Sequence, residues 1–100
     1  SLFSFPTPRT KRPPWEQLRS FVAAGLECDC PVAFLNLDNG KIRRLDRWHW
    51  VTLIGLDGDT ASIVDNGEAF TMDLRLWYDT TKTRGGFVSA LGPGEEFASC

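Results

Sequence analysis

Two apolar runs joined by a tight turn constrain the fold of this chain more than any other feature. WHWVTLIGL (48–56) and TASIVD (60–65) are separated by Asp57-Gly58-Asp59, and a second turn, Asn66-Gly67, follows. Gly, Asn and Asp are the residues that tight hairpin turns require. The pattern therefore predicts two neighbouring antiparallel strands. Because side chains alternate along a strand and both faces of 48–56 are largely apolar, this strand is expected at the centre of a sheet.

The rest of the chain predicts one helix and several shorter strands around this hairpin. Residues 14–26 carry apolar side chains at helical spacing, and Gly25 is a candidate stop for that helix. The other predicted elements are strands over 30–37, 69–72 and 85–91 and a helical turn capped by Asp73 over 73–80. An N-terminal helix followed by antiparallel strands with tight turns is typical of the α+β class, here as a curled sheet or half-barrel.

A chain of 100 residues makes a single domain or a part of one. Residues 1–13 are rich in proline and basic side chains and are expected to form an arm or linker. The folded unit is expected over 14–91, with a frayed tail over 92–100. No run reaches the roughly 18 apolar residues of a membrane span, and the N-terminus has no apolar signal-peptide core.

The charge of the chain gives no general attraction to nucleic acid or to anionic membranes. Lys+Arg number 11 and Asp+Glu 13, for a net charge of −2. A basic cluster over 41–47 is interpreted as a solvated loop face. The cysteines, Cys28, Cys30 and Cys100, are odd in number, which argues against a complete disulfide framework within the chain. Because Cys28-X-Cys30 lacks a second Cys/His pair at zinc spacing, no metal and no other cofactor is predicted.

The only histidine of the sequence, His49, stands at the start of the first apolar run, where a strand meets solvent. Counting strand pairs back from the Asp57-Gly58-Asp59 turn places it opposite a position near 67, within one or two residues of Asp65 and Asn66. Opposed Cβ atoms lie ~4.5–5.5 Å apart and diagonal ones ~7–8 Å, within reach of an imidazole and a carboxylate. Such an acceptor fixes the histidine tautomer and leaves the other ring nitrogen as a base.

The same residues also have a purely structural interpretation. A lone histidine at the end of a strand is often only a polar residue with a satisfied hydrogen bond, and Asp-Asn-Gly is an ordinary turn sequence. Alternation along the strand allows only one of Asp65 and Asn66 to face His49. The residue pattern by itself does not choose between a structural and a catalytic role.

The stretches CPVAFLNL and RWHWVTLIGLDGDTASIVDNG, followed by a short helix with Trp77 and a closing Gly-rich strand, resemble the second half of papain-like cysteine peptidases. The similarity covers residues 14–91, is greatest to the C39-like branch, and is most specific around His49. It implies the half-barrel part of a papain-like fold, a peptide or protein substrate, His49 as catalytic base and Asp65 as the residue that orients it. Other papain-like enzymes orient the histidine with asparagine, so Asn66 is the fallback.

The nucleophile of that family has no counterpart in this chain. In the family a cysteine heads a helix upstream of the histidine, with a glutamine shortly before it for the oxyanion hole. Here Cys28 and Cys30 follow the predicted helix instead. Because a helix N-terminus activates a thiol and a helix C-terminus or buried strand does not, we interpret both as packing residues.

Two functional hypotheses follow from this departure. In the first, the chain is the C-terminal portion of a cysteine peptidase that is inactive alone, and an N-terminal segment supplies the cysteine and glutamine. In the second, it is a non-catalytic module that retains the fold and binds a peptide or protein. Trp48 and Trp50 would then form an aromatic platform, with Arg43, Arg44 and Arg47 at its rim, although aromatic residues of a central strand are expected to pack in the core. A small β-domain with an accidental resemblance is the remaining alternative.

Overall fold

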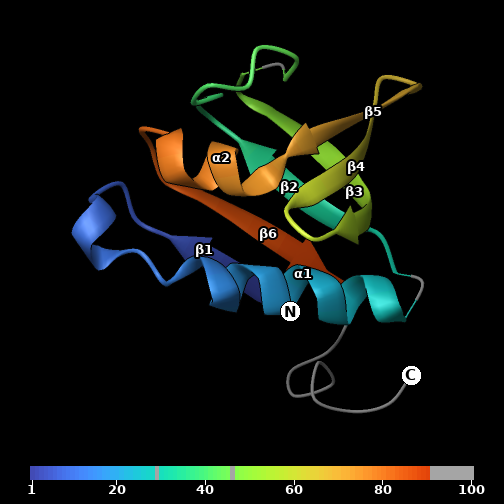
Figure 1. Ribbon diagram of the computed structural model, residues 1–100, viewed down its shortest axis with the longest axis horizontal. Helices are drawn as coiled ribbons and strands as arrows, with labels where there is room; N and C mark the ends of the chain where they lie inside the picture. The colour runs from blue at the N-terminus through green and yellow to red at the C-terminus, as the bar shows by residue number, and fades with distance from the viewer. Residues whose placement is uncertain (29, 46, 91–100) are drawn as a thin grey trace.

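The computed structural model describes residues 1–28, 30–45 and 47–90 (Figure 1). Six antiparallel strands form one sheet in the order β1-β6-β2-β3-β4-β5. The strands are β1 (Leu2–Phe5), β2 (Val32–Asn36), β3 (His49–Asp57), β4 (Thr60–Asp65), β5 (Glu68–Asp73) and β6 (Gly85–Ser89). The helical elements are the 3-10 turn η1 (Arg9–Lys11) and the helices α1 (Trp15–Glu27) and α2 (Leu74–Thr80). The predicted α+β class is confirmed.

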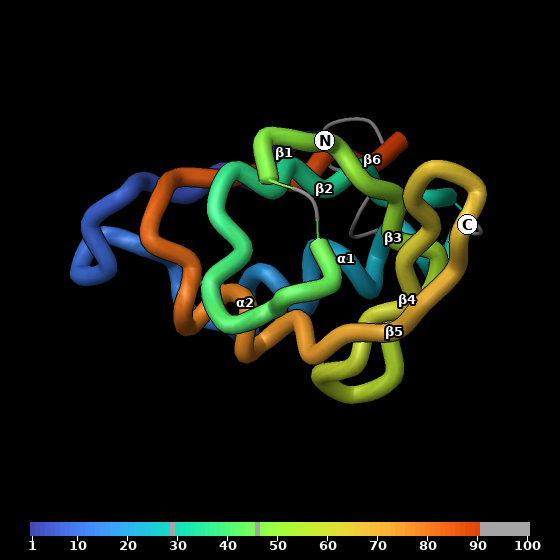
Figure 2. Tube along the Cα trace, turned by 90° about the horizontal axis from the view of Figure 1, so that it is seen from above, coloured from blue at the N-terminus to red at the C-terminus, as the bar shows by residue number. Residues whose placement is uncertain are grey.

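The sheet is curled, and both helices lie on its concave side (Figure 2). Strands β1, β6 and β2 form one flank, and β3, β4 and β5 bend away from it around the helices. β1 and β5 remain the two edges, so the sheet does not close into a barrel. The convex side carries neither helix. The papain-like assignment of this fold stays a prediction.

The predicted hairpin forms between β3 and β4. Asp57 pairs with Thr60, which leaves Gly58 and Asp59 as the two loop residues, and Gly58 has a φ of +61°. Farther along the ladder, the register shifts between Leu53 and Gly55. An extra residue in one strand bends it and increases its twist. This irregularity in a central strand therefore contributes to the curl of the sheet.

An aromatic cluster fills the concave side. The rings of Phe34 and Phe87 stack with centroids 5.0 Å apart, and Trp77 of α2 lies edge-on to them at 4.5 and 6.0 Å. All three side chains have no exposed surface. Aromatic pairs in such arrangements contribute about 0.5–1.5 kcal/mol each beyond the area they bury. The cluster therefore fastens α2 to the middle of the sheet.

The predicted helices form where their local signals place them. The apolar face of α1 buries Leu18 and Val22 against the sheet. The Asp73 side chain caps α2 by accepting a hydrogen bond from the main-chain N–H of Leu76 at 2.9 Å. Among the described residues, no helix combines the length and the apolar character needed to cross a bilayer.

Gly25 does not end the helix as the sequence suggested. α1 continues through it to Glu27. A Cβ atom at Gly25 would lie 2.9 Å from Val32 Cγ2 and 3.2 Å from Ser89 Cβ. The missing side chain thus lets α1 approach the sheet closely, which is a packing role that the linear sequence does not reveal.

Part of the segment 1–13, expected as an arm or linker, belongs to the sheet. Leu2–Phe5 pair with β6, and Phe5 is buried. Farther along, the Arg12 guanidinium donates to the main-chain carbonyls of Thr81 and Thr83 at 3.0 and 3.2 Å. The expected tail at 92–100 lies outside the described residues.

The two faces of the sheet make a matched stability test possible. We expect Ile63→Val, in the buried concave face, to lower the free energy of unfolding by roughly 0.5–1.5 kcal/mol because it leaves a cavity. Ile54→Val removes the same methylene group on the convex face, where Ile54 is 51% exposed, and should cost much less. Urea denaturation of both variants measures the difference. Equal losses of unfolding free energy in the two variants would contradict the conclusion that the convex face is uncovered.

Candidate active site

The candidate site begins at an unusual backbone position. Trp48, immediately before β3, has a φ of +58° and a side chain that is 76% exposed. Bulky residues rarely adopt this left-handed conformation, which costs of order 1–3 kcal/mol. Such strain persists only where the surrounding structure imposes it, and here it sets the direction in which the chain enters β3 at His49.

His49 and Asp65 contact each other directly. The distance from His49 Nε2 to Asp65 Oδ1 is 2.6 Å. The His49 side chain is 38% exposed, whereas that of Asp65 is only 9% exposed. The last recorded pair of the β3–β4 ladder is Thr52 with Val64, so the next step opposes Val51 and Asp65 and makes Asp65 the diagonal neighbour of His49. The strand register thus brings the two side chains together at the solvent-facing end of the concave face.

The geometry of this contact assigns the roles of the two ring nitrogens. An ionised carboxylate only accepts hydrogen bonds, so Nε2 is the donor and Nδ1 is the unprotonated nitrogen of the neutral ring. Nδ1 has no hydrogen-bond partner within the part of the chain that the structure describes. Nδ1 is therefore the ring nitrogen that can act as a base toward a neighbouring group, while the contact at Nε2 holds the ring in place.

Asn66 occupies a turn and not the ladder. Asp65 pairs with Glu68, which leaves Asn66 and Gly67 as the loop residues, with φ values of +51° and +79°. Positive φ at both positions is the signature of a type I′ turn, for which Asn-Gly is a preferred sequence. Asn66 is exposed there. The structure thus places Asp65 against His49 and uses Asn66 to reverse the chain.

Sequence reasoning missed a buried asparagine beside the histidine. Asn36 ends β2, is directly opposite His49 in the ladder, and has no exposed surface. Its amide oxygen accepts from Trp77 Nε1 at 2.9 Å, and its amide nitrogen donates to Asn39 Oδ1 at 2.5 Å. The sequence did contain one signal for this residue, namely that the apolar run VAFLN ends in a polar side chain. These bonds hold the end of β2 rigidly against the strand that carries the histidine.

The segment between β2 and β3 is held by Asp38. Its carboxylate accepts from the main-chain N–H groups of Lys82 and Gly40 at 2.9 and 3.1 Å. The bond from Lys82 is the main cause that lowers the pKa of Asp38, with smaller contributions from Gly40 and the charge of Arg47, while burial opposes the shift. The carbonyl of Asp38 accepts from Thr81 Oγ1 at 2.7 Å. Asp38 therefore ties this loop to the segment that follows α2.

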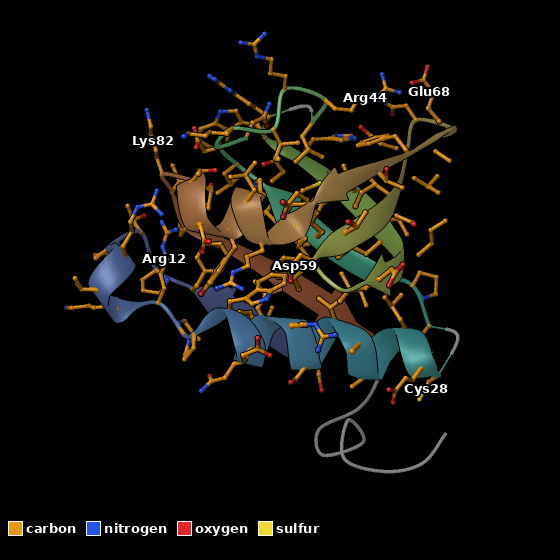
Figure 3. All side chains as sticks on the ribbon, in the orientation of Figure 1. Arg12, Cys28, Arg44, Asp59, Glu68 and Lys82 are labelled. Carbon is orange, nitrogen blue, oxygen red and sulfur yellow. The ribbon has the colours of Figure 1, made fainter. Side chains whose placement is uncertain are left out.

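The basic side chains of the 41–47 segment are exposed, as a solvated loop face requires. Arg44 forms an ion pair with Glu68 at 2.8 Å, and its guanidinium lies over the Phe70 ring at 4.8 Å (Figure 3). Both partners of the ion pair are more than half exposed, so its contribution to stability is small. The pair nevertheless joins the loop before β3 to the first residue of β5.

The two tryptophans next to His49 are not in the core. Trp48 and Trp50 are 76% and 51% exposed. The expectation that they pack inside was wrong because only the concave face of β3 is covered. That face buries Val51 and Leu53, and alternation sends Trp50 to the bare side.

The described cysteines do not face His49. Cys28, at the end of α1 (Figure 3), is disulfide-bonded, which corrects its interpretation as a packing residue. Cys30 is a free thiol two residues before the start of β2, whereas His49 pairs with Asn36 at the other end of that strand, which is about 13 Å long at ~3.3 Å per residue. Within the described ranges, no three His, Cys, Asp or Glu side chains form a group that could hold a metal ion.

No protein-family model, curated protein or solved structure matches the chain. The resemblance to papain-like peptidases therefore rests on the residues quoted above. The contact between His49 and Asp65 is a property of the structure that does not depend on that resemblance.

The His49–Asp65 contact predicts one tautomer. In neutral His49 the proton should sit on Nε2 and Nδ1 should be bare, as two-bond 1H–15N correlation spectra report. Asp65→Ala removes the acceptor and should give a mixture of tautomers. Asn66→Gly, which keeps the positive φ of the turn, is the matched control and should leave the spectrum unchanged. A mixed tautomer in the unmodified protein would contradict the contact.

Asp38 predicts a pH-dependent contribution to stability. Its folded pKa lies below the value of 3.8 for an unperturbed group, so its stabilisation is fully present above about pH 4 and is lost as the pH falls through the folded pKa. Asp38→Asn should therefore destabilise the protein at pH 7, by less than about 1 kcal/mol for so accessible a group, and by progressively less below pH 4. Urea denaturation across this range measures the effect. Exposed Asp57 provides the control Asp57→Asn, and a loss for Asp38→Asn that is constant with pH would contradict the prediction.

Proposed function

We propose that this chain is the histidine-bearing C-terminal portion of a papain-like, C39-like cysteine peptidase. His49 is the general base and Asp65 the residue that orients it. The observation that carries the proposal is the 2.6 Å contact from His49 Nε2 to Asp65 Oδ1, which leaves Nδ1 available in a partly exposed ring. The order of motifs around His49 supports the family, and the chemistry of the pair supports the role.

The proposed reaction uses both ring nitrogens of His49 and the carboxylate of Asp65. Nδ1 accepts the proton of a cysteine thiol, and the thiolate attacks the carbonyl carbon of a peptide bond. Asp65 stabilises the imidazolium that forms and holds the ring in place. The imidazolium then gives its proton to the departing amine as the C–N bond breaks. Water, deprotonated at Nδ1, hydrolyses the acyl-enzyme and returns the thiol.

The nucleophile has to come from a segment other than the described cysteines. Cys28 is disulfide-bonded, and Cys30 lies at the opposite end of β2 from His49. An N-terminal segment that supplies a cysteine, with a glutamine for the oxyanion hole, is part of the proposal. A site that lacks its nucleophile retains at most ~10³–10⁴-fold catalysis over water, so this chain alone is expected to be inactive.

A non-catalytic peptide-binding or protein-binding module is the second candidate. It is favoured by the exposed apolar side chains of the convex face, above all Trp50 and Ile54, each of which is 51% exposed. Exposed apolar surface of this kind marks interaction sites. In such a module His49 and Asp65 would be only a polar pair at the end of a strand.

The two candidates differ in the reactivity of a thiol in the full gene product. A thiolate held by the His49 imidazolium is already formed at pH 6, whereas an ordinary thiol with a pKa of about 8.5 is almost entirely protonated. We expect one cysteine upstream of Ser1 to be alkylated by iodoacetamide at pH 6 about two orders of magnitude faster than a free cysteine. His49→Gln should abolish this acceleration and the hydrolysis of peptide substrates.

Asp65→Ala should reduce the alkylation rate and the hydrolysis rate, and Asp57→Ala, at the other end of the same hairpin, is its control. If the full gene product contains no cysteine upstream of Ser1 or no rapidly alkylated cysteine, the peptidase proposal fails. If His49→Gln leaves the rate unchanged, it also fails. In either case the binding module is the remaining candidate.

A further inference from the structure

The convex face of the sheet is apolar and carries no helix (Figure 2). Its exposed large side chains are Leu2, Trp50, Ile54 and Val88, with 68%, 51%, 51% and 40% of their surface accessible. They come from strands β1, β3 and β6, so they are spread across the face and are not a local cluster. Exposed apolar side chains on an uncovered sheet face are typical of a surface that binds another molecule.

A groove of about 630 Å³ crosses this face. Its floor follows one row of the sheet, because Gly86 pairs with both Ser4 and Leu35, and Leu35 pairs with Trp50. Three strand spacings of ~4.8 Å make the row about 14 Å long, the length of roughly four residues of extended peptide. The groove therefore has the dimensions of a short extended segment.

Gly86 creates the depression in this row. It lies between Leu35 and Ser4 and contributes no side chain to the floor, and a Cβ atom there would lie 3.1 Å from the carbonyl oxygen of Phe3. Leu2 lines one side of the groove, and Pro6 and Pro8 of the N-terminal stretch line another part. Prolines and a strand-paired tryptophan make these walls stiff, which reduces the entropy lost on binding.

The charge of the groove is of one sign. Among the residues that the structure describes, Arg84 is the only charged one that lines it. Arg9 and Arg12 lie in the adjoining N-terminal stretch (Figure 3 labels Arg12) and donate to main-chain carbonyls, including that of Thr81. Burial and, next, the neighbouring charge of Arg9 lower the pKa of Arg12. Within the described residues, no carboxylate forms a salt bridge with any of the three arginines.

We propose that this groove binds an extended peptide whose apolar side chains lie over the row from Ser4 to Trp50 and whose carboxylate pairs with Arg84. Aromatic-lined and proline-lined grooves commonly hold extended peptides, and the uncompensated positive charge selects an acidic one. The groove contains neither His49 nor Asp65, so this site is additional to the proposed peptidase chemistry and does not depend on it.

Titration of the 15N-labelled chain with tetrapeptide probes of three charges tests the site. The probes are acetyl-Leu-Val-Leu-Glu-amide and its counterparts with Gln and with Lys in place of Glu, each also in the reversed order. The Glu peptides should shift the Gly86 amide and Trp50 indole resonances saturably. They should bind up to about five-fold more tightly than the Gln peptides, the range expected for one exposed ion pair, and the Lys peptides should bind most weakly.

Two sets of variants test the contribution of the charge of the groove and that of its apolar wall separately. Arg84→Glu should reverse the preference, so that the Lys peptides bind best, and Arg43→Glu, which changes an exposed arginine of the other basic loop, should leave it unaltered. Trp50→Ala should weaken all three probes in parallel. Trp50 is half exposed, so its removal leaves the buried core intact.

Several outcomes would overturn the proposal. The first is the absence of a saturable shift with the Glu peptides at millimolar concentration, and the second is equal affinity for all three charges. A third is dimerisation, seen by sedimentation, that shifts the same resonances when the protein alone is concentrated, because the face would then bind a second copy. Failure of acrylamide to quench Trp50 in the full gene product would show that the protein itself covers the groove. None of these results bears on thiol alkylation, which tests the peptidase proposal.

Discussion

Trp77 is the side chain on which the arrangement of this protein most depends. It has no exposed surface, and its ring lies 4.5 Å from Phe34 and 6.0 Å from Phe87. Its indole N–H reaches the Asn36 side chain at 2.9 Å and the Asp38 carbonyl at 3.1 Å. One residue of a short helix thus joins the aromatic core to the polar end of β2. Because Asn36 is opposite His49, the same contacts also fix the strand end at which the candidate site lies.

Because the helices cover only one face of the sheet, the two faces of β3 lie in different surroundings. On the concave face, His49 follows the direction of Val51 and Leu53 and meets a nearly buried carboxylate. On the convex face, Trp50 lies in an open groove that Arg84 also lines. Neighbouring residues of one strand therefore contribute to two proposed sites with different chemistry. The strained backbone at Trp48 sets the direction in which the chain enters this strand.

Local sequence signals were sufficient to predict most elements and the strand pairing that brings His49 to Asp65. The turn residues determined the hairpins, and the spacing of apolar residues determined α1. Alternation alone could not decide between Asp65 and Asn66. The type I′ turn decides it, since a residue with a φ of +51° has left the ladder. Gly25 and Asn36 were not recognised because their roles depend on segments that are distant in the sequence, namely Val32 and Ser89 for the first and Trp77 for the second.

The sequence by itself determined the α+β class, the order of the elements from α1 onward and the neighbourhood of the histidine and the acid, because these depend on interactions between residues close in the chain. Only the tertiary structure decided that residues 2–5 complete the sheet, that the helices cover one face, and that Trp48 and Trp50 remain outside the core. Those outcomes depend on which face of a central strand packs against another segment of the chain. An apolar residue has the same local pattern whether its face is covered or bare, so burial is settled by packing between distant segments.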